Sequence, residues 1–241
     1  MRTLIWSEDG SPTLYSDTFG ETYHSDAGAV EESMHVFLQA GLEHRLAHWF
    51  QSTDHPEKKC LYVVEYGFGT GLNVLLTLDR HIRLRAQGIP TPDLLFHTLE
   101  KYPLEEAEYG CLNFPKSEHL YHPELLQDLH RAPWNQLVEL APGFTLLKEE
   151  ADFLEVTPEH FRQPIDVVYF DAFSPSSQPE LWETPVFETL AHSAAPGCTL
   201  VTYSARGSVK QALRTSGFTV GRLHGYGRKR HMVRAIFEHA R

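Results

Sequence analysis

Three glycines at alternate positions, Gly67, Gly69 and Gly71, join a short apolar segment to a longer helical one. Residues 60–66 are rich in Val and Tyr, which favours a strand, and residues 72–84 have the apolar spacing of a helix. Glycine allows a sharp turn and a close approach of the backbone to a ligand. A strand that passes through such a turn into a helix is typical of a ligand-binding α/β sheet.

The same strand and helix alternation continues to the end of the chain. Further strands are expected at residues 94–99, 144–147, 165–170, 199–203, 218–223 and 232–237. Helices are expected at residues 104–109, 186–192 and 209–215. Continuous apolar strands alternating with helices predict a Rossmann-like α/β fold, with a mostly parallel seven-stranded sheet covered on both faces. A glycine-rich turn between the last two strands makes one C-terminal strand antiparallel.

Two regions lie outside this alternation. Residues 1–59 are expected to form an N-terminal extension that packs on the catalytic domain, residues 60–241. The extension contains short strands or turns at 14–23 and a helix at 31–50, before a break at Asp54-His55-Pro56-Glu57. Prolines interrupt residues 111–143, which we expect to be an insertion with short helices.

Composition indicates a globular cytoplasmic protein that binds neither a membrane nor a metal. Hydrophobic residues make up 41% of the chain, yet no apolar run approaches the roughly 20 residues of a membrane span. Ser7, Glu8 and Asp9 follow the first six residues at once, which argues against a signal peptide. The three cysteines lie far apart, and His44 and His48 lack a third ligand in a known metal-binding pattern.

The charge is unevenly distributed along the chain. The net charge is −11, but no Asp or Glu lies between Glu188 and Glu238. That segment carries eight basic residues, so the remainder carries −19. A basic C-terminal quarter is compatible with an anionic partner, although a solvated basic face explains it equally well.

The glycine spacing narrows the ligand class. The pattern is G-x-G-x-G, whereas a dinucleotide fold has G-x-G-x-x-G, and the Lys-Ser/Thr pair of a phosphate-binding loop is absent. A loop without a phosphate site suits a nucleoside sulfonium such as S-adenosylmethionine. A glycine turn without any ligand is the alternative.

Acidic residues follow three of the expected strands. Glu100 ends the second strand, where its carboxylate could accept hydrogen bonds from both ribose hydroxyls. Asp152, close to Glu149 and Glu150, follows the third strand and could bind the adenine amino group. The sequence alone does not show which of Glu149, Glu150 and Asp152 would bind the adenine. The alternative is that these acids only stabilise the N-terminus of a helix through its dipole.

Asp171 directly follows the fourth strand, where a substrate would meet the methyl group of the cofactor. A carboxylate there can orient an amine and take up its proton. Phe173, two residues later, could stack on a base or fill the core. Asp171 could instead be a turn or cap residue.

The last motif is a basic turn between the final two strands. Tyr226 precedes Arg228, Lys229 and Arg230, and this combination can bind phosphates and stack a base. A plain basic hairpin turn is the alternative.

Taken together, these motifs resemble a known family over residues 15–235. The segments that carry the resemblance are Glu31-Glu32, Gly67-Phe68-Gly69-Thr70-Gly71-Leu72-Asn73, Asp171-Ala172-Phe173-Ser174-Pro175, Pro179-Glu180-Leu181-Trp182, Pro196-Gly197-Cys198-Thr199-Leu200 and Gly225-Tyr226-Gly227-Arg228-Lys229-Arg230. In this order they are similar to the MnmC-type methyltransferases, which complete 5-methylaminomethyl-2-thiouridine at the tRNA wobble position.

The resemblance implies a class I methyltransferase fold, S-adenosylmethionine as methyl donor and tRNA, at its anticodon region, as partner. It implies that the cofactor is surrounded by Tyr23, Glu32, Gly67, Gly69, Gly71, Asn73, Glu100 and Asp152. Asp171 would lie at the acceptor amine. The chain is too short for the flavin-dependent oxidase half of bifunctional relatives, so we expect it to methylate an aminomethyl group made by other enzymes.

Two other functions stay open at this point. An NAD-dependent oxidoreductase could use the same sheet, although the glycine spacing disfavours it. A non-catalytic tRNA-binding module would depend on the basic hairpin and not on Asp171.

Overall fold

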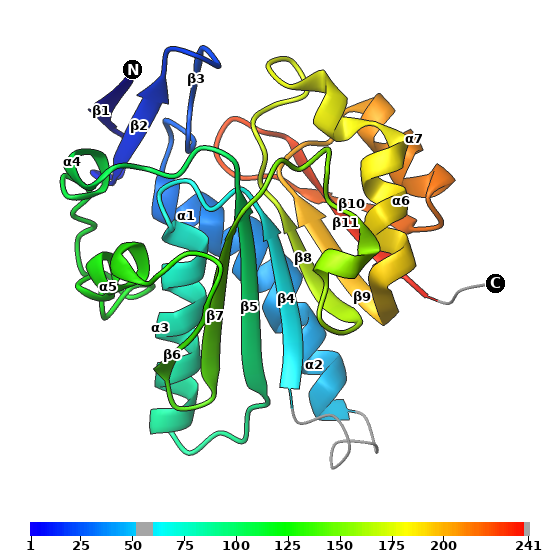
Figure 1. Cartoon of the computed structure of the whole chain (residues 1–241), viewed down its shortest axis with the longest axis horizontal. Helices are drawn as coiled ribbons and strands as arrows, with labels where there is room; N and C mark the ends of the chain where they lie inside the picture. The colour runs from blue at the N-terminus through cyan, green and yellow to red at the C-terminus, as the bar shows by residue number, and fades with distance from the viewer. Residues whose placement is uncertain (52–59, 239–241) are drawn as a thin grey trace.

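A twisted eight-stranded sheet forms the centre of the molecule (Figure 1). The computed structural model describes residues 1–51 and 60–238. Along the sheet the strands follow the order β10-β11-β9-β8-β4-β5-β7-β6. Their bounds are β4 Cys60–Tyr66, β5 Asp93–Glu100, β6 Leu137–Ala141, β7 Phe144–Glu150, β8 Ile165–Phe170, β9 Ala194–Thr202, β10 Thr219–His224 and β11 His231–Phe237.

The predicted α/β class is confirmed, and the sheet has one strand more than predicted. Strands β4, β5, β7, β8 and β9 are parallel, and β11 is antiparallel to both of its neighbours. The additional strand, β6, pairs antiparallel with β7 at the sheet edge. It lies inside the expected insertion at 111–143, because that region returns to the sheet before β7 begins.

Helices cover both faces of the sheet, as the sequence predicts. One face is covered by α1 (Ala29–Ser33), the π-helical segment η1 (Met34–Glu43), α2 (His44–Gln51), α3 (Leu72–Ala86) and α5 (Leu125–Arg131). The other is covered by α6 (Thr184–Ser193) and α7 (Gly207–Thr215), together with the 3₁₀ turn η3 (Pro179–Trp182). A short helix, α4 (Glu106–Tyr109), and a 3₁₀ turn, η2 (Pro158–His160), lie in the connections.

Side chains of β4 alternate between two hydrophobic cores. Leu61 and Val63 belong to the core under α1–α3, whereas Tyr62 and Val64 belong to the core under α6 and α7. All four are fully buried. This alternation is the expected result of a strand with a period of two between two helical layers, and it places Glu65 on the α3 side.

The N-terminal residues form a second, smaller sheet. Strands β1 (Arg2–Trp6), β2 (Pro12–Ser16) and β3 (Glu21–Thr22) pair antiparallel at one side of the carboxyl ends of the central strands (Figure 1). Leu14 and the α1 side chains share one core with α3 and β4. The division at residue 59 stays a prediction, and the expected break at 54–57 lies outside the described residues.

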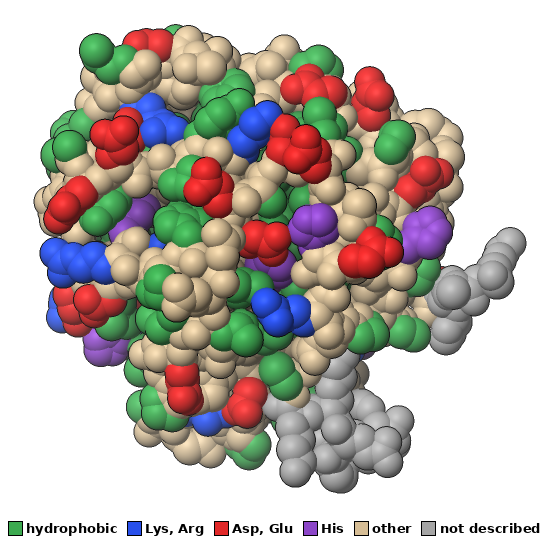
Figure 2. Space-filling view, viewed as in Figure 1, with side chains coloured by type: hydrophobic (Ala, Val, Ile, Leu, Met, Phe, Trp, Pro, Cys, Tyr) green, Lys and Arg blue, Asp and Glu red, His purple; other side chains and the backbone are tan. Residues whose placement is uncertain are grey.

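The surface carries a mixture of charges. Acidic side chains are spread over the face that Figure 2 shows, and basic side chains are fewer there. Within residues 1–51 and 60–238, no helix is long and apolar enough to cross a membrane. The same residues contain no group of three or more His, Cys, Asp or Glu side chains arranged to hold a metal ion. The sequence-based prediction that no metal binds stays a prediction.

Candidate active site

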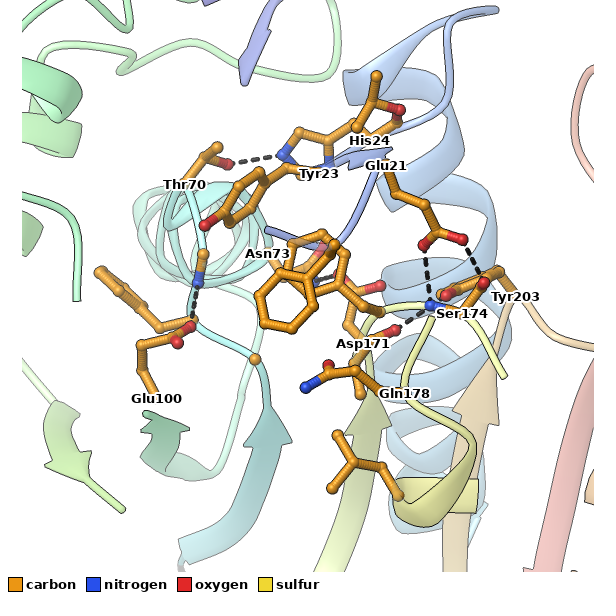
Figure 3. Close-up of a pocket in the computed structure, with 18 of the residues that line it drawn as sticks. Glu21, Tyr23, His24, Thr70, Asn73, Glu100, Asp171, Ser174, Gln178 and Tyr203 are labelled. Atoms are coloured by element: carbon orange, nitrogen blue, oxygen red, sulfur yellow. Dashed lines mark hydrogen bonds between the residues drawn. The ribbon is translucent and has the colours of Figure 1, made fainter. Parts of the chain in front are cut away.

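A cavity of about 580 Å³ lies at the carboxyl ends of the central strands. Turns after β4, β5, β7 and β8 line it from the sheet side, where the chain order reverses between β4 and β8. This is the position at which open α/β sheets bind ligands. Figure 3 shows the labelled side chains directed toward the space between these turns and the N-terminal strands.

Most of the predicted site residues lie together around this cavity. Its lining includes Tyr23, Glu32, Gly67, Gly69, Asn73, Glu100, Asp152, Asp171, Phe173 and Lys229. Four predicted residues are not part of the lining: Gly71, Tyr226, Arg228 and Arg230. Gly71 is instead the N-cap of α3, in a left-handed conformation beside the ring of Phe68.

The glycine loop is fixed by hydrogen bonds to the neighbouring strand. The N–H groups of Gly67 and Phe68 both donate to the carbonyl of Leu99, at 3.0 and 3.3 Å. Gly67 has φ of +104°, and a Cβ there would lie 2.7 Å from the carbonyl oxygen of Asp171. A side chain at position 67 would therefore collide with the turn that follows β8.

Glu100 ends β5 and contacts the glycine loop. The Gly69 N–H donates to Glu100 Oε2 at 3.0 Å, and the Tyr102 N–H donates to Oε1 at 2.8 Å. Burial raises the pKa of Glu100, and these backbone hydrogen bonds partly oppose the rise. A carboxylate offers about four lone-pair positions, so two remain for ligand hydroxyls.

The structure distinguishes among the three acids near the end of β7. Asp152 lines the cavity and pairs with Lys101, whose Nζ donates to Oδ2. That hydrogen bond lowers the pKa of Asp152. Glu149 lies within β7 and accepts a hydrogen bond from the buried His97 at 2.8 Å, and neither Glu149 nor Glu150 lines the cavity.

Asp171 lies at the other side of the cavity, immediately after β8. Its Oδ2 accepts a 2.8 Å hydrogen bond from Asn73 Nδ2 in the first turn of α3. Burial raises the pKa of Asp171 well above its ordinary range; the Asn73 hydrogen bond opposes this, nearby Glu32 adds to it, and Lys229 lowers it. A carboxylate with a raised pKa is a stronger base than an exposed one, which suits proton transfer from an amine.

The N-terminal strand β3 forms one wall of the cavity. Glu21 accepts a hydrogen bond from the Ser174 N–H at 3.0 Å and contacts the Ser174 hydroxyl (Figure 3). His24 Nε2 lies 2.6 Å from the Thr70 hydroxyl in the glycine loop. Burial lowers the pKa of His24 to about 4, so this ring is neutral at physiological pH.

An aromatic cluster lies beside this wall. Phe173 stacks on Phe19 with ring centroids 4.3 Å apart, and Tyr23 contacts it edge-on at 5.0 Å. The Trp182 indole N–H donates to the Phe173 carbonyl at 2.8 Å and holds the turn in place. The motif after the fourth expected strand pointed to Phe173, and the family resemblance pointed to Tyr23. Neither pointed to Glu21, His24 and Phe19, which contact the site from far away in the chain.

The basic hairpin between β10 and β11 reaches the cavity edge through one side chain. Lys229 Nζ lies 2.6 Å from Glu32 Oε1 and 4.2 Å from the centre of the Tyr203 ring. Arg228 forms an exposed pair with Glu8 at 3.1 Å. Arg230 is exposed at the hairpin, outside the cavity. The hairpin is therefore joined to the N-terminal segment.

Comparison with known proteins shows which family the chain is similar to. A model of S-adenosyl-L-methionine-dependent methyltransferases matches residues 121–238. The chain is 35% identical to the tRNA 5-methylaminomethyl-2-thiouridine biosynthesis bifunctional protein MnmC of Idiomarina loihiensis, over 96% of this chain and 38% of that protein. It is 34% identical to the MnmC protein of Pseudomonas paraeruginosa, over 98% of this chain and 35% of that protein. The chain belongs to this methyltransferase family.

A solved structure agrees with this assignment. The crystal structure of MNMC2 from Aquifex aeolicus matches 98% of the methyltransferase described here and 70% of its own chain, with a TM-score of 0.74 and 29% identity. The methyltransferase spans just over a third of the length of the curated MnmC relatives. Membership of the family makes S-adenosyl-L-methionine its cofactor, and the side chains of Glu100 and Asp152 line the cavity.

Proposed function

We propose that this methyltransferase transfers a methyl group to the amine of 5-aminomethyl-(2-thio)uridine at the tRNA wobble position, forming the 5-methylaminomethyl product. The observation that carries the proposal is the position of Asp171, a carboxylate with a raised pKa across the cavity from the Glu100 end. The names of the MnmC relatives indicate the substrate class. The family match favours methyl transfer over hydride transfer to NAD.

The cofactor would lie along the glycine loop. Gly67 and Gly69 allow its close approach, Glu100 would accept from the ribose hydroxyls, and Asp152 would accept from the adenine amino group. Asn73 belongs to the cavity lining, so its side chain would lie beside the bound cofactor. S-adenosylmethionine supplies an electrophilic methyl group on a sulfonium centre.

Asp171 would act on the acceptor amine. A free aminomethyl group is largely protonated at neutral pH, and the amine must be neutral to attack a methyl carbon. Asp171 would accept the proton, directly or through a water molecule, and orient the nitrogen lone pair toward the sulfonium methyl. The N–C bond forms as the S–C bond breaks, and S-adenosylhomocysteine leaves.

Two groups of residues would bind the tRNA. Phe173 would stack on the wobble base, since its ring lies in the cavity lining beside Asp171. Tyr226, Arg228, Lys229 and Arg230 on the hairpin would contact phosphates and a base. The acidic face in Figure 2 is a poor surface for a polyanion, which favours the hairpin side.

The deciding experiment is mass analysis of wobble nucleosides after incubation of the protein with S-adenosylmethionine and tRNA carrying 5-aminomethyluridine. The expected result is the gain of one methyl group on that nucleoside. Asp171→Asn should lower kcat by roughly 10²- to 10⁴-fold, the usual contribution of a general base. Asp128→Asn, an exposed acid on α5, is the matched control with an unchanged rate.

Two results would contradict the proposal. Unmodified wobble nucleosides with the wild-type protein, at saturating cofactor, would exclude this acceptor. A wild-type rate for Asp171→Asn would exclude Asp171 as the base. Calorimetry with S-adenosylmethionine and with NAD separates cofactor binding from these outcomes, and tRNA binding without methylation would favour the non-catalytic binding module.

A further inference from the structure

A fully buried acid lies behind the proposed active site. Glu65, the penultimate residue of β4, has no exposed surface and does not line the cavity. It is paired in the sheet with Thr98 of β5 and Tyr169 of β8. Its side chain lies close enough to Asn73 and Asp171 for both to influence its pKa.

The polar atoms in this group leave two acceptors without a donor. Thr98 Oγ1 donates to Glu65 Oε2 at 2.6 Å, and Asn73 Nδ2 donates to Asp171 Oδ2 at 2.8 Å. Glu65 Oε1 and Asn73 Oδ1 are both buried and both have no hydrogen-bond partner. Buried polar atoms are almost always paired, and a proton on the Glu65 carboxyl would let that group donate to the Asn73 oxygen.

Glu65 is the group that can carry it. Burial raises the pKa of Glu65 well above its ordinary range; Thr98 and Asn73 oppose the rise, and the nearby carboxylates of Asp171 and Glu100 add to it. A neutral Glu65 has an O–H donor, and Asn73 Oδ1 is a buried, unpaired acceptor on a side chain close enough to influence the Glu65 pKa. The reversed orientation of the Asn73 amide would direct its oxygen at the Asp171 carboxylate, which is an unfavourable contact between two acceptors.

We propose that Glu65 is a positioning residue for the methyl-transfer site: as a neutral acid it donates to Asn73 Oδ1 and thereby holds the Asn73 amide so that Nδ2 binds Asp171. This inference rests on the proposed function for its consequence in catalysis. Asp171 then keeps one oxygen on Asn73 and presents the other to the acceptor amine. Loss of the Glu65 proton would free the amide to rotate.

The first test is a carbon-13 NMR titration of the carboxyl groups in the free protein, which needs no acceptor. In wild type, the Glu65 resonance should report a protonated acid at pH 7. An ionised Glu65 at pH 7 would overturn the proposal, whether or not any variant folds.

The second test follows the titration midpoint of Asp171 in variants. Asn73→Ala should raise the midpoint, because it removes a donor that favours the carboxylate. Glu65→Met should raise it by the same amount, and the double variant should match Asn73→Ala alone. Glu65→Gln retains a donor and should leave the midpoint unchanged. Tyr169→Phe, which alters the other neighbour of Glu65 in the sheet, is the control with no change.

The third test connects the network to the reaction. Glu65→Met should lower kcat for tRNA methylation by at least tenfold with unchanged calorimetric affinity for S-adenosylmethionine, and Glu65→Gln should restore kcat to within twofold of wild type. An unshifted Asp171 midpoint in Glu65→Met, or a loss confined to cofactor affinity, would overturn the positioning role. If wild type does not methylate tRNA, the proposed function fails, and the two titrations still test the network.

Discussion

At the scale of single residues, the site depends on acids held where water is scarce. Asp171 and Glu65 both have a pKa well above the ordinary range, because burial disfavours their charged forms. Glu100, by contrast, receives two backbone hydrogen bonds. In the proposed reaction the two carboxylates would have different tasks: Glu100 would accept hydrogen bonds from the ligand, and Asp171 would take up a proton.

This environment predicts a stability cost at neutral pH. A carboxyl group with a raised pKa binds its proton more tightly in the folded state, so the contribution of Asp171 to stability is fully present at low pH and is lost as pH rises from about 3.8 through the raised pKa. Asp171→Asn should raise the free energy of unfolding at pH 8 by about 1–2 kcal/mol, because the variant has no buried charge at this position. Gains of this size are typical when a destabilising active-site residue is replaced.

Thermal unfolding of wild type and Asp171→Asn at pH 4 and pH 8 measures this effect. The difference in Tm should be present at pH 8 and shrink toward pH 4. A variant that is less stable than wild type at pH 8 would show that the Asn73 hydrogen bond outweighs the burial of charge.

At the scale of elements, the glycine loop joins β4 to α3 and lies against the turn that follows β8. Gly67 and Gly88 both have positive φ, of +104° and +70°. A Cβ at Gly67 would lie 2.7 Å from a backbone oxygen, whereas a Cβ at Gly88 meets nothing within 4 Å. Substituting each of these two glycines therefore separates the cost of the left-handed backbone conformation from the cost of a steric collision.

Gly67→Ala should therefore cost much more stability than Gly88→Ala. We expect about 1 kcal/mol for Gly88→Ala from the left-handed conformation alone, and about 3 kcal/mol or more for Gly67→Ala, where a backbone shift is added. Urea unfolding measures both values. Equal costs would mean that the turn after β8 moves away without resistance.

The β10–β11 hairpin is joined to the N-terminal segment by two ion pairs in different environments. The Lys229–Glu32 pair is partly buried, with side-chain exposures of 39% and 9%, and the Arg228–Glu8 pair is 86% and 64% exposed. Lys229→Met should cost about 1–3 kcal/mol, because it leaves a buried carboxylate without a cation. Arg228→Met is the matched control, with a cost below about 0.5 kcal/mol.

Chemical unfolding of both variants tests the assignment. Glu32→Gln combined with Lys229→Met should recover part of the loss, since the uncompensated charge is gone. Similar costs for Lys229→Met and Arg228→Met would show that the buried pair contributes no more than a surface pair.

Much of this arrangement follows from patterns that are local in the chain. Strands β4, β5 and β8 were predictable because each is a continuous apolar run, and Glu100 and Asp171 because each ends such a run. Strand β6 was missed because it lies among the prolines of the insertion. Glu21 and His24 were missed for another reason: Glu21 contacts Ser174 across 153 positions, and no local pattern reports such a contact.

At the scale of the whole molecule, we expect three histidines with a lowered pKa to weaken the fold in acid. Burial lowers the pKa of His24, His44 and His130 to about 4. A lowered histidine pKa means that the unfolded state takes up the proton first, so stability is intact above about pH 6.5 and is lost as pH falls toward 4.

His130 is suited to a test of this behaviour, because it is 7% exposed and its Nε2 lies 3.0 Å from the carbonyl oxygen of Thr70. Between pH 7 and pH 4, the free energy of unfolding should fall less steeply in His130→Gln than in wild type, by at most about 3 kcal/mol over that interval. His192→Gln, an exposed histidine at the end of α6, is the control with the wild-type slope. Parallel slopes for His130→Gln and wild type would contradict the assignment.

The contact between Lys229 and Glu32 also bears on the order in which the molecule is assembled. It joins residues 197 positions apart, and the Arg228–Glu8 pair joins residues 220 apart. Contacts between such distant segments form after the entropy of closing a long loop has been overcome, so they tend to be late events in folding. Newly made chains should pair strands β4 to β9 first, and should complete the binding pocket only when the β10–β11 hairpin has docked on β9 and on the N-terminal segment.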